Sequence, residues 1–295
     1  MDSRQEPLVS IIIPTHNRKK KLLRLLNSIF NSSYSNLDII VIDDASSENA
    51  SIEIRSQFPL VKIIRNHKEL FPSMCRNIGI KQSKGNFVLL IDDDNIIHEK
   101  SLSELVKTAS NSKIGLVGPI MYYYSDPDRI WCAGAKLNRL LFTHKQLNED
   151  RIDKGLLQTT QECDYFPNAF MLRKNVLDEV GYFDTFSFPQ AFEEIDLAER
   201  VRKAGYKVVL APTAKIWHDI PVLANKPHRP SKIRAYLRGR SRIMFYRKYA
   251  PWRLTFLMFD IFMFSLRKIS YKNPWKEKKA VVRYFLRGIV DGLFA

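Results

Sequence analysis

The sequence predicts an α/β fold in which helices flank a mostly parallel central sheet. Short apolar runs alternate with polar stretches of helical periodicity through residues 1–118. Polar and acidic residues directly follow three of these runs, at positions 15–18, 43–44 and 92–94. Because this alternation implies crossover connections, it favours a parallel sheet covered on both faces. Ligands bind such sheets beyond the carboxyl ends of the strands, so the polar residues are expected at a site.

Each predicted element has a local signal. Leucine and isoleucine recur at helical spacing after residue 18, and Pro72 suits the first position of a helix. Strands are expected at 8–14, 37–42, 60–64, 86–91 and 114–118, and helices at 18–31, 50–57 and 72–83. Residues 131–161 are less regular; an apolar run at 164–173, a helix at 195–204 closed by Gly205 and a strand at 206–210 follow.

The net charge of +16 is concentrated near the end of the chain. Residues 226–295 hold 18 Lys and Arg against 3 acids, which gives +15 and leaves +1 for residues 1–225. We therefore expect a nearly neutral domain at 1–225 and a basic helical extension at 226–295. Such an extension favours a polyanion: an anionic membrane surface, a lipid phosphate or nucleic acid.

The cysteines indicate the compartment. Cys75, Cys132 and Cys163 are far apart and form no paired motif, which argues against a disulfide framework or a zinc site. A reducing, cytoplasmic setting fits this usage. The first seven residues are polar, so we expect no signal peptide.

An acidic run, Asp92, Asp93 and Asp94, follows an apolar strand. Adjacent carboxylates repel one another, so they favour a positive partner. Mg²⁺ or Mn²⁺ would bind carboxylate oxygens and a diphosphate together. The alternative is a solvated turn whose acids cap a helix.

Other polar segments allow nucleotide binding without specifying it. Residues 14–18 lack both a GxGxxG pattern and a P-loop, although their backbone amides could hold a nucleotide. Asp43 and Asp44 could accept hydrogen bonds from a base or ribose, or could cap a turn. Arg76 offers the planar donors that suit phosphate.

A second acidic cluster begins a helix. Glu193, Glu194 and Asp196 include a candidate general base for a hydroxyl proton, and acids there also stabilise a helix N-terminus. His218 is either a metal ligand or a structural histidine.

The extension contains two apolar segments. Residues 254–266 are too short to span a membrane as a helix, and Asp260 interrupts them. Residues 275–294 form a basic amphipathic pattern, which predicts a helix that lies in a membrane interface or packs against the protein.

Five segments in order resemble the family-two glycosyltransferases of the GT-A fold: VSIIIPTHNR, DIIVIDDASSE, RNHKELFPSMCRNIGIKQSKGNFVLLIDDDN, DYFPNAFMLRKNVLDEVGYFDTFSF and FEEIDLAERVRKAGYKVVLAPTAKIWH. The resemblance covers about residues 8–218. Within the family, the chain is similar to bacterial and archaeal rhamnosyltransferase-like members. It implies a Rossmann-like nucleotide-binding half at about 1–118 and an acceptor half at about 119–225. Asn168 stands where the family often has glycine.

The resemblance implies a role for each matching residue. Pro14, Thr15, Asn17 and Arg18 match the stretch that contacts the nucleotide, Asp44 with its neighbour Asp43 matches the acid near the base, and Arg76 approaches the diphosphate. Asp92 and Asp94 match the two carboxylates of the DxD metal motif, with Asp93 between them, and His218 matches a histidine that helps hold the metal. Glu194 matches the base position, where aspartate is frequent, so Glu193 and Asp196 stay open as the base.

The implied activity is metal-dependent, inverting transfer of a hexosyl or deoxyhexosyl group from a nucleotide-diphosphate sugar. Glycan, lipid-linked oligosaccharide and surface polysaccharide synthesis are the expected settings, on the cytoplasmic face of a membrane. A transferase-like scaffold subunit without activity is the alternative, and an oligomer is possible. A less favoured hypothesis is a nucleic-acid-binding protein that stacks bases on aromatic side chains of the extension.

Overall fold

The computed structural model describes residues 6–48, 51–139, 143–220, 232–256, 259 and 275–295. The chain divides into two compact units. Unit 1 comprises residues 1–182 and 197–222, and unit 2 comprises residues 183–196 and 223–295. The boundary between them falls within helix α6 (Glu193–Lys203). The predicted domains, 1–225 and 226–295, stay a prediction.

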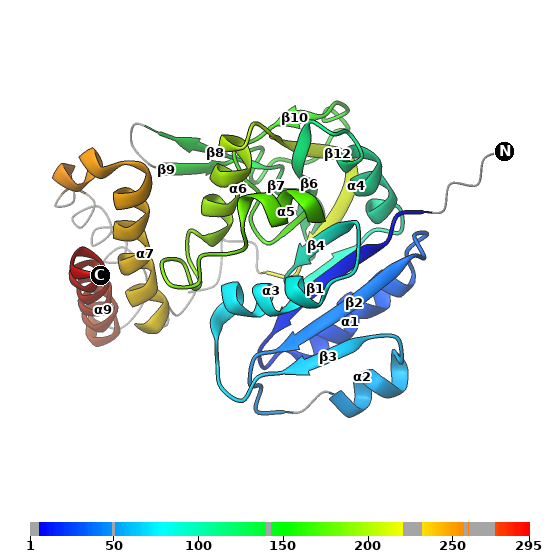
Figure 1. The fold of residues 1–295 in the computed structure, drawn as a ribbon, viewed down its shortest axis with the longest axis horizontal. Helices are drawn as coiled ribbons and strands as arrows, with labels where there is room; N and C mark the ends of the chain where they lie inside the picture. Colours follow the sequence, from blue (N-terminus) through cyan, green and yellow to red (C-terminus); the bar gives the residue numbers. More distant parts are fainter. Residues whose placement is uncertain (1–5, 49–50, 140–142, 221–231, 257–258, 260–274) are drawn as a thin grey trace. The chain divides into compact units, whose positions relative to one another are not determined.

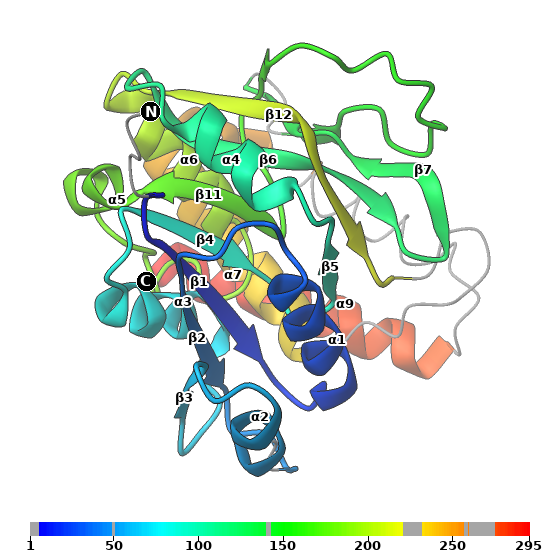
Figure 2. The same ribbon diagram turned by 90° about the vertical axis from the view of Figure 1, so that its right-hand side faces the viewer.

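Unit 1 is built around a sheet whose first half is parallel. The spatial order is β3 (Lys62–Arg65), β2 (Leu37–Asp43), β1 (Val9–Thr15) and β4 (Phe87–Ile91), as Figures 1 and 2 show. β1 and β4 are almost wholly buried, which explains why they appear in the sequence as continuous apolar runs. The predicted α/β class is confirmed.

The sheet becomes mixed beyond β4. β11 (Ala169–Arg173) runs antiparallel between β4 and β6 (Ile114–Tyr123), and β12 (Lys207–His218) runs parallel to β6. The remaining strands pair antiparallel: β5 (Asn95–Ile97) and β10 (Gln161–Glu162) with β12, β7 (Asp126–Cys132) with β6, and β8 (Ala135–Asn138) with β9 (Thr143–Gln146).

Helices cover both faces of the parallel half. These helices are α1 (Lys19–Phe30), α2 (Ser51–Gln57) and α3 (Phe71–Gln82), whereas α4 (Ser101–Ala109) and α5 (Lys174–Val180) pack on the mixed half of the sheet. Alternate residues of β2 point to opposite faces: Ile39 and Val41 join the core cluster that contains the apolar stripe of α1, whereas Ile40 and Ile42 join Cys75 of α3. β2 therefore packs against α1 on one face and against α3 on the other.

Several elements differ from the predicted bounds. β12 continues to His218 instead of ending at residue 210, with its pairing register shifted between Ala211 and Lys215. Pro212 lies within that irregularity, and proline inside a strand is tolerated at such a bulge. β5, α4 and α5 were not predicted, and the segment 131–161 contains the short strands β8 and β9.

Unit 2 contains α7 (Lys232–Tyr249), the 3₁₀ helix η1 (Pro251–Phe256) and α9 (Trp275–Phe294). α7 and α9 approach closely because glycine lies at their contact. A Cβ on Gly239 would lie 2.2 Å from the Phe285 carbonyl oxygen, and one on Gly288 would lie 2.0 Å from the Tyr236 carbonyl oxygen. The predicted helix at 275–294 is confirmed, and α7 agrees with the expected helical extension, although its bounds were not predicted.

The apolar stretch 254–266 lies largely outside the described residues. Within the described part of the chain, no helix combines the length and the apolar character that crossing a membrane requires.

Candidate functional site

The acidic run of unit 1 begins where β4 ends. Ile91 is the last strand residue, and the next N–H, that of Asp92, donates to the Asn168 carbonyl oxygen at 3.2 Å. Asp92 Oδ1 accepts a hydrogen bond from Arg76 Nη2 at 2.8 Å. Arg76 is only 1% exposed. Arg76 therefore supports Asp92 from within the fold.

Arg18 joins the first βα turn to the same run. Its Nη1 lies 3.0 Å from Asp93 Oδ1 and 2.8 Å from Asp94 Oδ2. Thr15 Oγ1 donates to Asp93 Oδ2 at 2.7 Å. The structure thus brings two of the four predicted residues of the first turn, Thr15 and Arg18, onto the acidic run, where the guanidinium offsets the repulsion between the carboxylates.

The surroundings of Asp93 and Asp94 shift the pKa values of these two buried carboxyls in opposite directions. Burial raises the pKa of Asp93 to about 6, although the charge of Arg18 works in the opposite direction. Burial also opposes ionisation of Asp94, but the neighbouring His218, Arg18 and Lys21 lower its pKa to about 2. Asp94 is therefore charged throughout the physiological range, and Asp93 titrates near its lower end.

Asp94 and His218 form the part of the predicted metal site that the structure assembles. Asp94 Oδ1 is buried and accepts no hydrogen bond, and His218 Nε2 lies 3.3 Å from it. Asp92 instead faces Arg76, and the described residues contain no cluster of three or more His, Cys, Asp or Glu placed to hold a metal. A buried carboxylate oxygen without a donor, beside an imidazole nitrogen, fits a divalent cation.

Two asparagines, Asn95 and Asn168, connect His218 to the acidic run through hydrogen bonds. Asn95 Nδ2 donates to the Asp92 carbonyl oxygen and to Asn168 Oδ1, and Asn168 Nδ2 lies 2.9 Å from His218 Nε2. Sequence reasoning did not identify this network, because Asn95 and Asn168 are 73 residues apart and Asn168 and His218 are 50 residues apart. The only local signal was an asparagine at a position where the family often has glycine.

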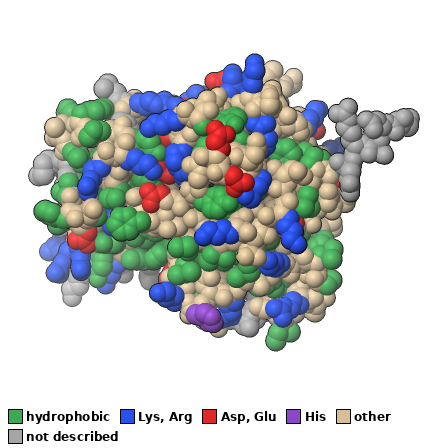
Figure 3. Space-filling view, viewed as in Figure 1, with side chains coloured by type: hydrophobic (Ala, Val, Ile, Leu, Met, Phe, Trp, Pro, Cys, Tyr) green, Lys and Arg blue, Asp and Glu red, His purple; other side chains and the backbone are tan. Residues whose placement is uncertain are grey.

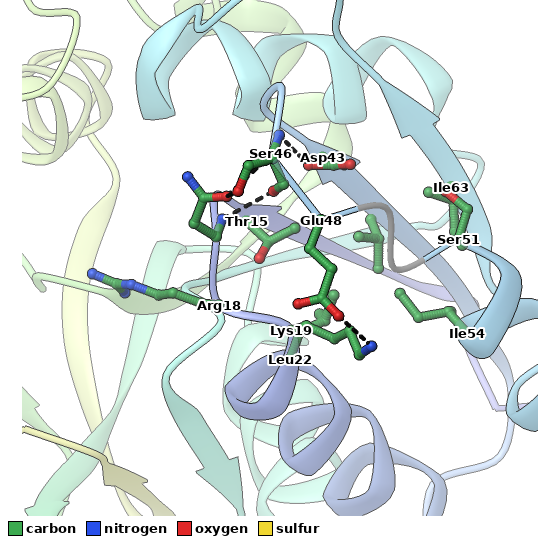
Figure 4. A pocket seen from close by; sticks show the side chains of 13 residues that line it. Thr15, Arg18, Lys19, Leu22, Asp43, Ser46, Glu48, Ser51, Ile54 and Ile63 are labelled. Carbon is green, nitrogen blue, oxygen red and sulfur yellow. Dashed lines mark hydrogen bonds and ion pairs between the residues drawn. The ribbon is translucent and has the colours of Figure 1, made fainter.

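A pocket of about 110 Å³ opens beside the first turn, as Figure 4 shows. Its lining combines apolar and polar side chains: Leu22, Val41, Ile54 and Ile63, with Thr15, Asn17, Asp43, Ser46 and Ser51. Lys19 and Glu48, 2.7 Å apart, lie at the same pocket, while the Arg18 side chain points away from them. Thr15 and Arg18 therefore link the pocket to the acidic run.

The two acids after β2 make different contacts. Asp44 accepts hydrogen bonds from the N–H groups of residues 70–71 and from Asn66 Nδ2. Asp43 Oδ1 accepts from the Ser46 N–H at 3.0 Å, and Asp43 lines the pocket. Asp44 thus holds the start of α3, and neither Asp44 nor Pro14 is among the pocket residues.

Strained backbone gathers at this edge of the sheet. Asn17, Ala45, Phe71 and Asn168 have φ values of 56°, 57°, 66° and 70°. Alanine and phenylalanine rarely adopt this left-handed conformation, so surrounding contacts must impose it. One such contact is the hydrogen bond from the Phe71 N–H to Asp44.

The second acidic cluster, Glu193, Glu194 and Asp196, belongs to unit 2. Asp196 is completely buried, Glu193 is 8% exposed and Glu194 is half-buried. Asp196 Oδ1 accepts hydrogen bonds from Lys248 Nζ and Tyr249 Oη, both at 2.7 Å. Glu194 is therefore the most accessible of the three candidate bases.

Comparisons with known proteins extend the sequence resemblance. The family model described as Glycosyl transferase family 2 matches residues 10–181. Uncharacterized protein y4gI of Sinorhizobium fredii is 30% identical over 244 residues, or 77% of this chain and 26% of that protein. Glycosyltransferase AglE of Haloferax volcanii is 27% identical over 232 residues, or 76% of this chain and 68% of that protein. The chain thus spans about a quarter of the length of the first relative.

Solved structures show the same fold. GalNAc-T7 with UDP, GalNAc and Mn²⁺ superposes with a TM-score of 0.62 at 18% identity, covering 83% of this chain and 54% of that chain. The mannosyltransferase PcManGT of Pyrobaculum calidifontis, in complex with GDP-Man and Mn²⁺, gives a TM-score of 0.60 at 14% identity, covering 99% and 88%. At these identities the likeness establishes the fold alone.

Proposed function

The chain belongs to glycosyl transferase family 2 and has the GT-A fold, and from this premise we propose that it moves a sugar from a nucleotide-diphosphate sugar to an acceptor hydroxyl with inversion. The observation that carries the proposal is the buried, undonated Asp94 Oδ1 beside His218 Nε2, at a site linked by Thr15 and Arg18 to a pocket. A hexosyl or deoxyhexosyl group is the proposed cargo.

The pocket is the proposed place of the nucleobase. Its apolar wall suits the faces of a flat ring, and Asn17 and Asp43 supply polar groups to its edge. Arg18 is better placed than Arg76 to contact the diphosphate, because its side chain is 39% exposed whereas Arg76 is buried behind Asp92.

Asp94 and His218, together with Asp92, would hold Mn²⁺ or Mg²⁺. When bound, the cation supplies Lewis-acid stabilisation of the charge that develops on the leaving diphosphate. Glu194 is the proposed base that takes the proton from the acceptor hydroxyl, since Asp196 is engaged by Lys248 and Tyr249.

The proposed acceptor is a glycan or a lipid-linked or surface polysaccharide intermediate at the cytoplasmic face of a membrane. α9 uses Val281, Phe285 and Ile289 to pack in the core of unit 2. It leaves Val290, Leu293 and Phe294 51%, 40% and 87% exposed. Arg283 and Arg287 are exposed on the same helix, and Figure 3 shows hydrophobic and basic side chains intermixed over this region. Apolar side chains among basic ones suit an anionic membrane interface.

Calorimetric titration with UDP, dTDP, GDP and CDP, with and without Mn²⁺, tests the donor site. We expect one nucleotide to bind more tightly with Mn²⁺, and Asp94→Ala to weaken that binding by about tenfold or more, in line with the loss of a metal ligand. Asp178→Ala, an exposed acid of α5, is the matched control and should bind as the wild type does. Mn²⁺-independent binding that survives in Asp94→Ala would refute the assignment of the metal.

A further inference from the structure

The C-terminal extension contacts the segment that carries the proposed base. Residues 183–196 group with residues 223–295, although residues 197–222 separate them in the chain. Ser241 Oγ, fully buried on α7, donates to the Ser187 carbonyl oxygen at 2.9 Å. Phe245 of α7 lies against both Phe188 and Phe192, with ring centroids 6.1 Å and 5.2 Å apart. α7 is thus the support of this segment within unit 2.

The strongest contact is made to the first turn of α6. Asp196 has no exposed surface, and its Oδ1 receives both the Lys248 ammonium and the Tyr249 hydroxyl at 2.7 Å. A buried carboxylate is stable only when it is paired and hydrogen-bonded, so these two donors fix where Asp196 lies. Glu194 precedes Asp196 by two residues on the same helical turn.

The residue before the helix is strained. Phe192 has a φ of 68°, which a bulky side chain rarely adopts, and the Asp196 N–H donates to its carbonyl oxygen at 2.9 Å. Such a conformation persists only where the surroundings over-determine it. Here the surroundings are Phe245, whose ring lies against that of Phe192 at an interplanar angle of 32°, and the two donors that hold Asp196.

We propose that Lys248 and Tyr249 are positioning residues for the transfer reaction: they anchor Asp196 and thereby set the direction of Glu194. This inference rests on the proposed function, because it takes Glu194 as the base. It divides the acidic cluster into one carboxylate for proton transfer and one for support. It also makes the extension a part of the catalytic apparatus, in addition to any role at a membrane.

The first test needs no substrate. In hydrogen exchange on the full chain, Lys248→Met and Tyr249→Phe should each speed exchange of the amides of residues 193–198, while Lys248→Arg should preserve their protection. Lys232→Met, at the other end of α7, is the matched control and should leave these amides unchanged. Unchanged exchange at 193–198 in both Lys248→Met and Tyr249→Phe would overturn the proposal.

The second test measures hydrolysis of UDP-glucose, GDP-mannose and dTDP-rhamnose, in which water takes the sugar in place of the acceptor hydroxyl, with nucleoside diphosphate release as the readout. A base displaced by about an ångström can cost on the order of 10² in rate. We expect Lys248→Met to lower kcat by about that factor with an unchanged donor KM, and Lys248→Arg to recover most of it. Faster exchange with an unchanged kcat would also overturn the proposal.

Failure of the proposed function would look different. It would show as a wild-type protein that binds none of the four nucleotides in calorimetry. A protein that binds a nucleotide normally but turns over independently of Lys248 and Tyr249 would refute only the positioning role.

Discussion

The two acidic clusters look alike in the sequence, yet the structure uses them differently. In unit 1, Arg18 contacts Asp93 and Asp94 together, so a flexible and half-exposed cation balances the run. In unit 2, Lys248 Nζ lies 2.7 Å from Asp196 Oδ1 and 3.8 Å from Asp184 Oδ2, so its nearer partner is Asp196. In each cluster a cation from elsewhere in the chain holds one carboxylate: Arg76 holds Asp92, and Lys248, together with Tyr249, holds Asp196. The comparison teaches that neighbouring carboxylates of one acidic motif take different partners, and that residues distant in the sequence decide which partner each has.

The largest expected effect separates the members of the unit 2 cluster. Glu194→Gln removes the proposed base without changing side-chain size, so we expect kcat to fall by about 10² to 10⁴-fold. Nucleotide binding should persist, because the pocket lies in unit 1. Steady-state kinetics with the bound sugar nucleotide, beside calorimetry, measure both quantities. Glu179→Gln, an exposed acid of α5, is the control. Full activity in Glu194→Gln would reassign the base to Glu193 or Asp196.

The second prediction concerns the stability of the supporting contact. Lys248→Met leaves the buried Asp196 carboxylate with one charged partner fewer, and we expect the free energy of unfolding to fall by about 3 kcal/mol. Asp196→Asn should cost less, about 1 kcal/mol, because the amide keeps a hydrogen bond and the half-exposed lysine reaches water. Urea denaturation measures both. Equal losses in the two variants would show that Asp196 is not held as a buried charge.

The third prediction tests the unit 1 cluster through pH. The pKa of Asp93 is raised from 3.8 to about 6 in the folded protein, so the folded state binds this proton more tightly than the unfolded state does. The contribution of protonated Asp93 to the free energy of unfolding is therefore complete below about pH 4 and is lost as the pH rises through about 6. Without metal, wild type should therefore lose up to about 3 kcal/mol relative to Asp93→Asn between pH 4 and 7.

Asp128→Asn, an exposed acid, is the control for this titration and should track the wild type. A constant difference between wild type and Asp93→Asn across this range would mean that Arg18 keeps Asp93 fully charged. In that case Asp93 and Asp94 would share one charge state, and a difference between neighbouring carboxylates would hold only in unit 2.

The parallel half of the sheet followed from the sequence because each buried strand is a continuous apolar run. The α1 stripe was equally clear, since Leu22, Leu25, Leu26 and Ile29 are all buried. β12 was shortened in the prediction because Pro212 interrupts its pattern, and only pairing with β6 shows that the strand continues.

The site was predictable as a set of residues but not as a set of contacts. Local sequence shows that Asp92, Asp93 and Asp94 follow a strand. It does not show that Arg76 engages the first while Arg18 engages the other two, because these partners lie 16 to 76 residues away. The link between Asp196 and Lys248, 52 residues apart, was hidden for the same reason.

The smallest expected effect concerns what the cations of the two units do. Arg18 and Arg76 face carboxylates of the acidic run. Arg283 and Arg287 are exposed on α9 beside apolar side chains, and Arg287 Nε lies 3.9 Å from Asp291 Oδ2. Each basic residue near an anionic membrane contributes about 1 kcal/mol, so the double variant Arg283→Gln and Arg287→Gln should bind phosphatidylserine vesicles roughly 30-fold more weakly. Sedimentation with vesicles measures this.

The control, Arg55→Gln with Lys81→Gln, removes the same charge from exposed positions of unit 1. Equal weakening by both pairs would mean that net charge, and no particular surface, governs binding. Loss confined to the α9 pair would place the membrane contact on the same extension that holds Asp196.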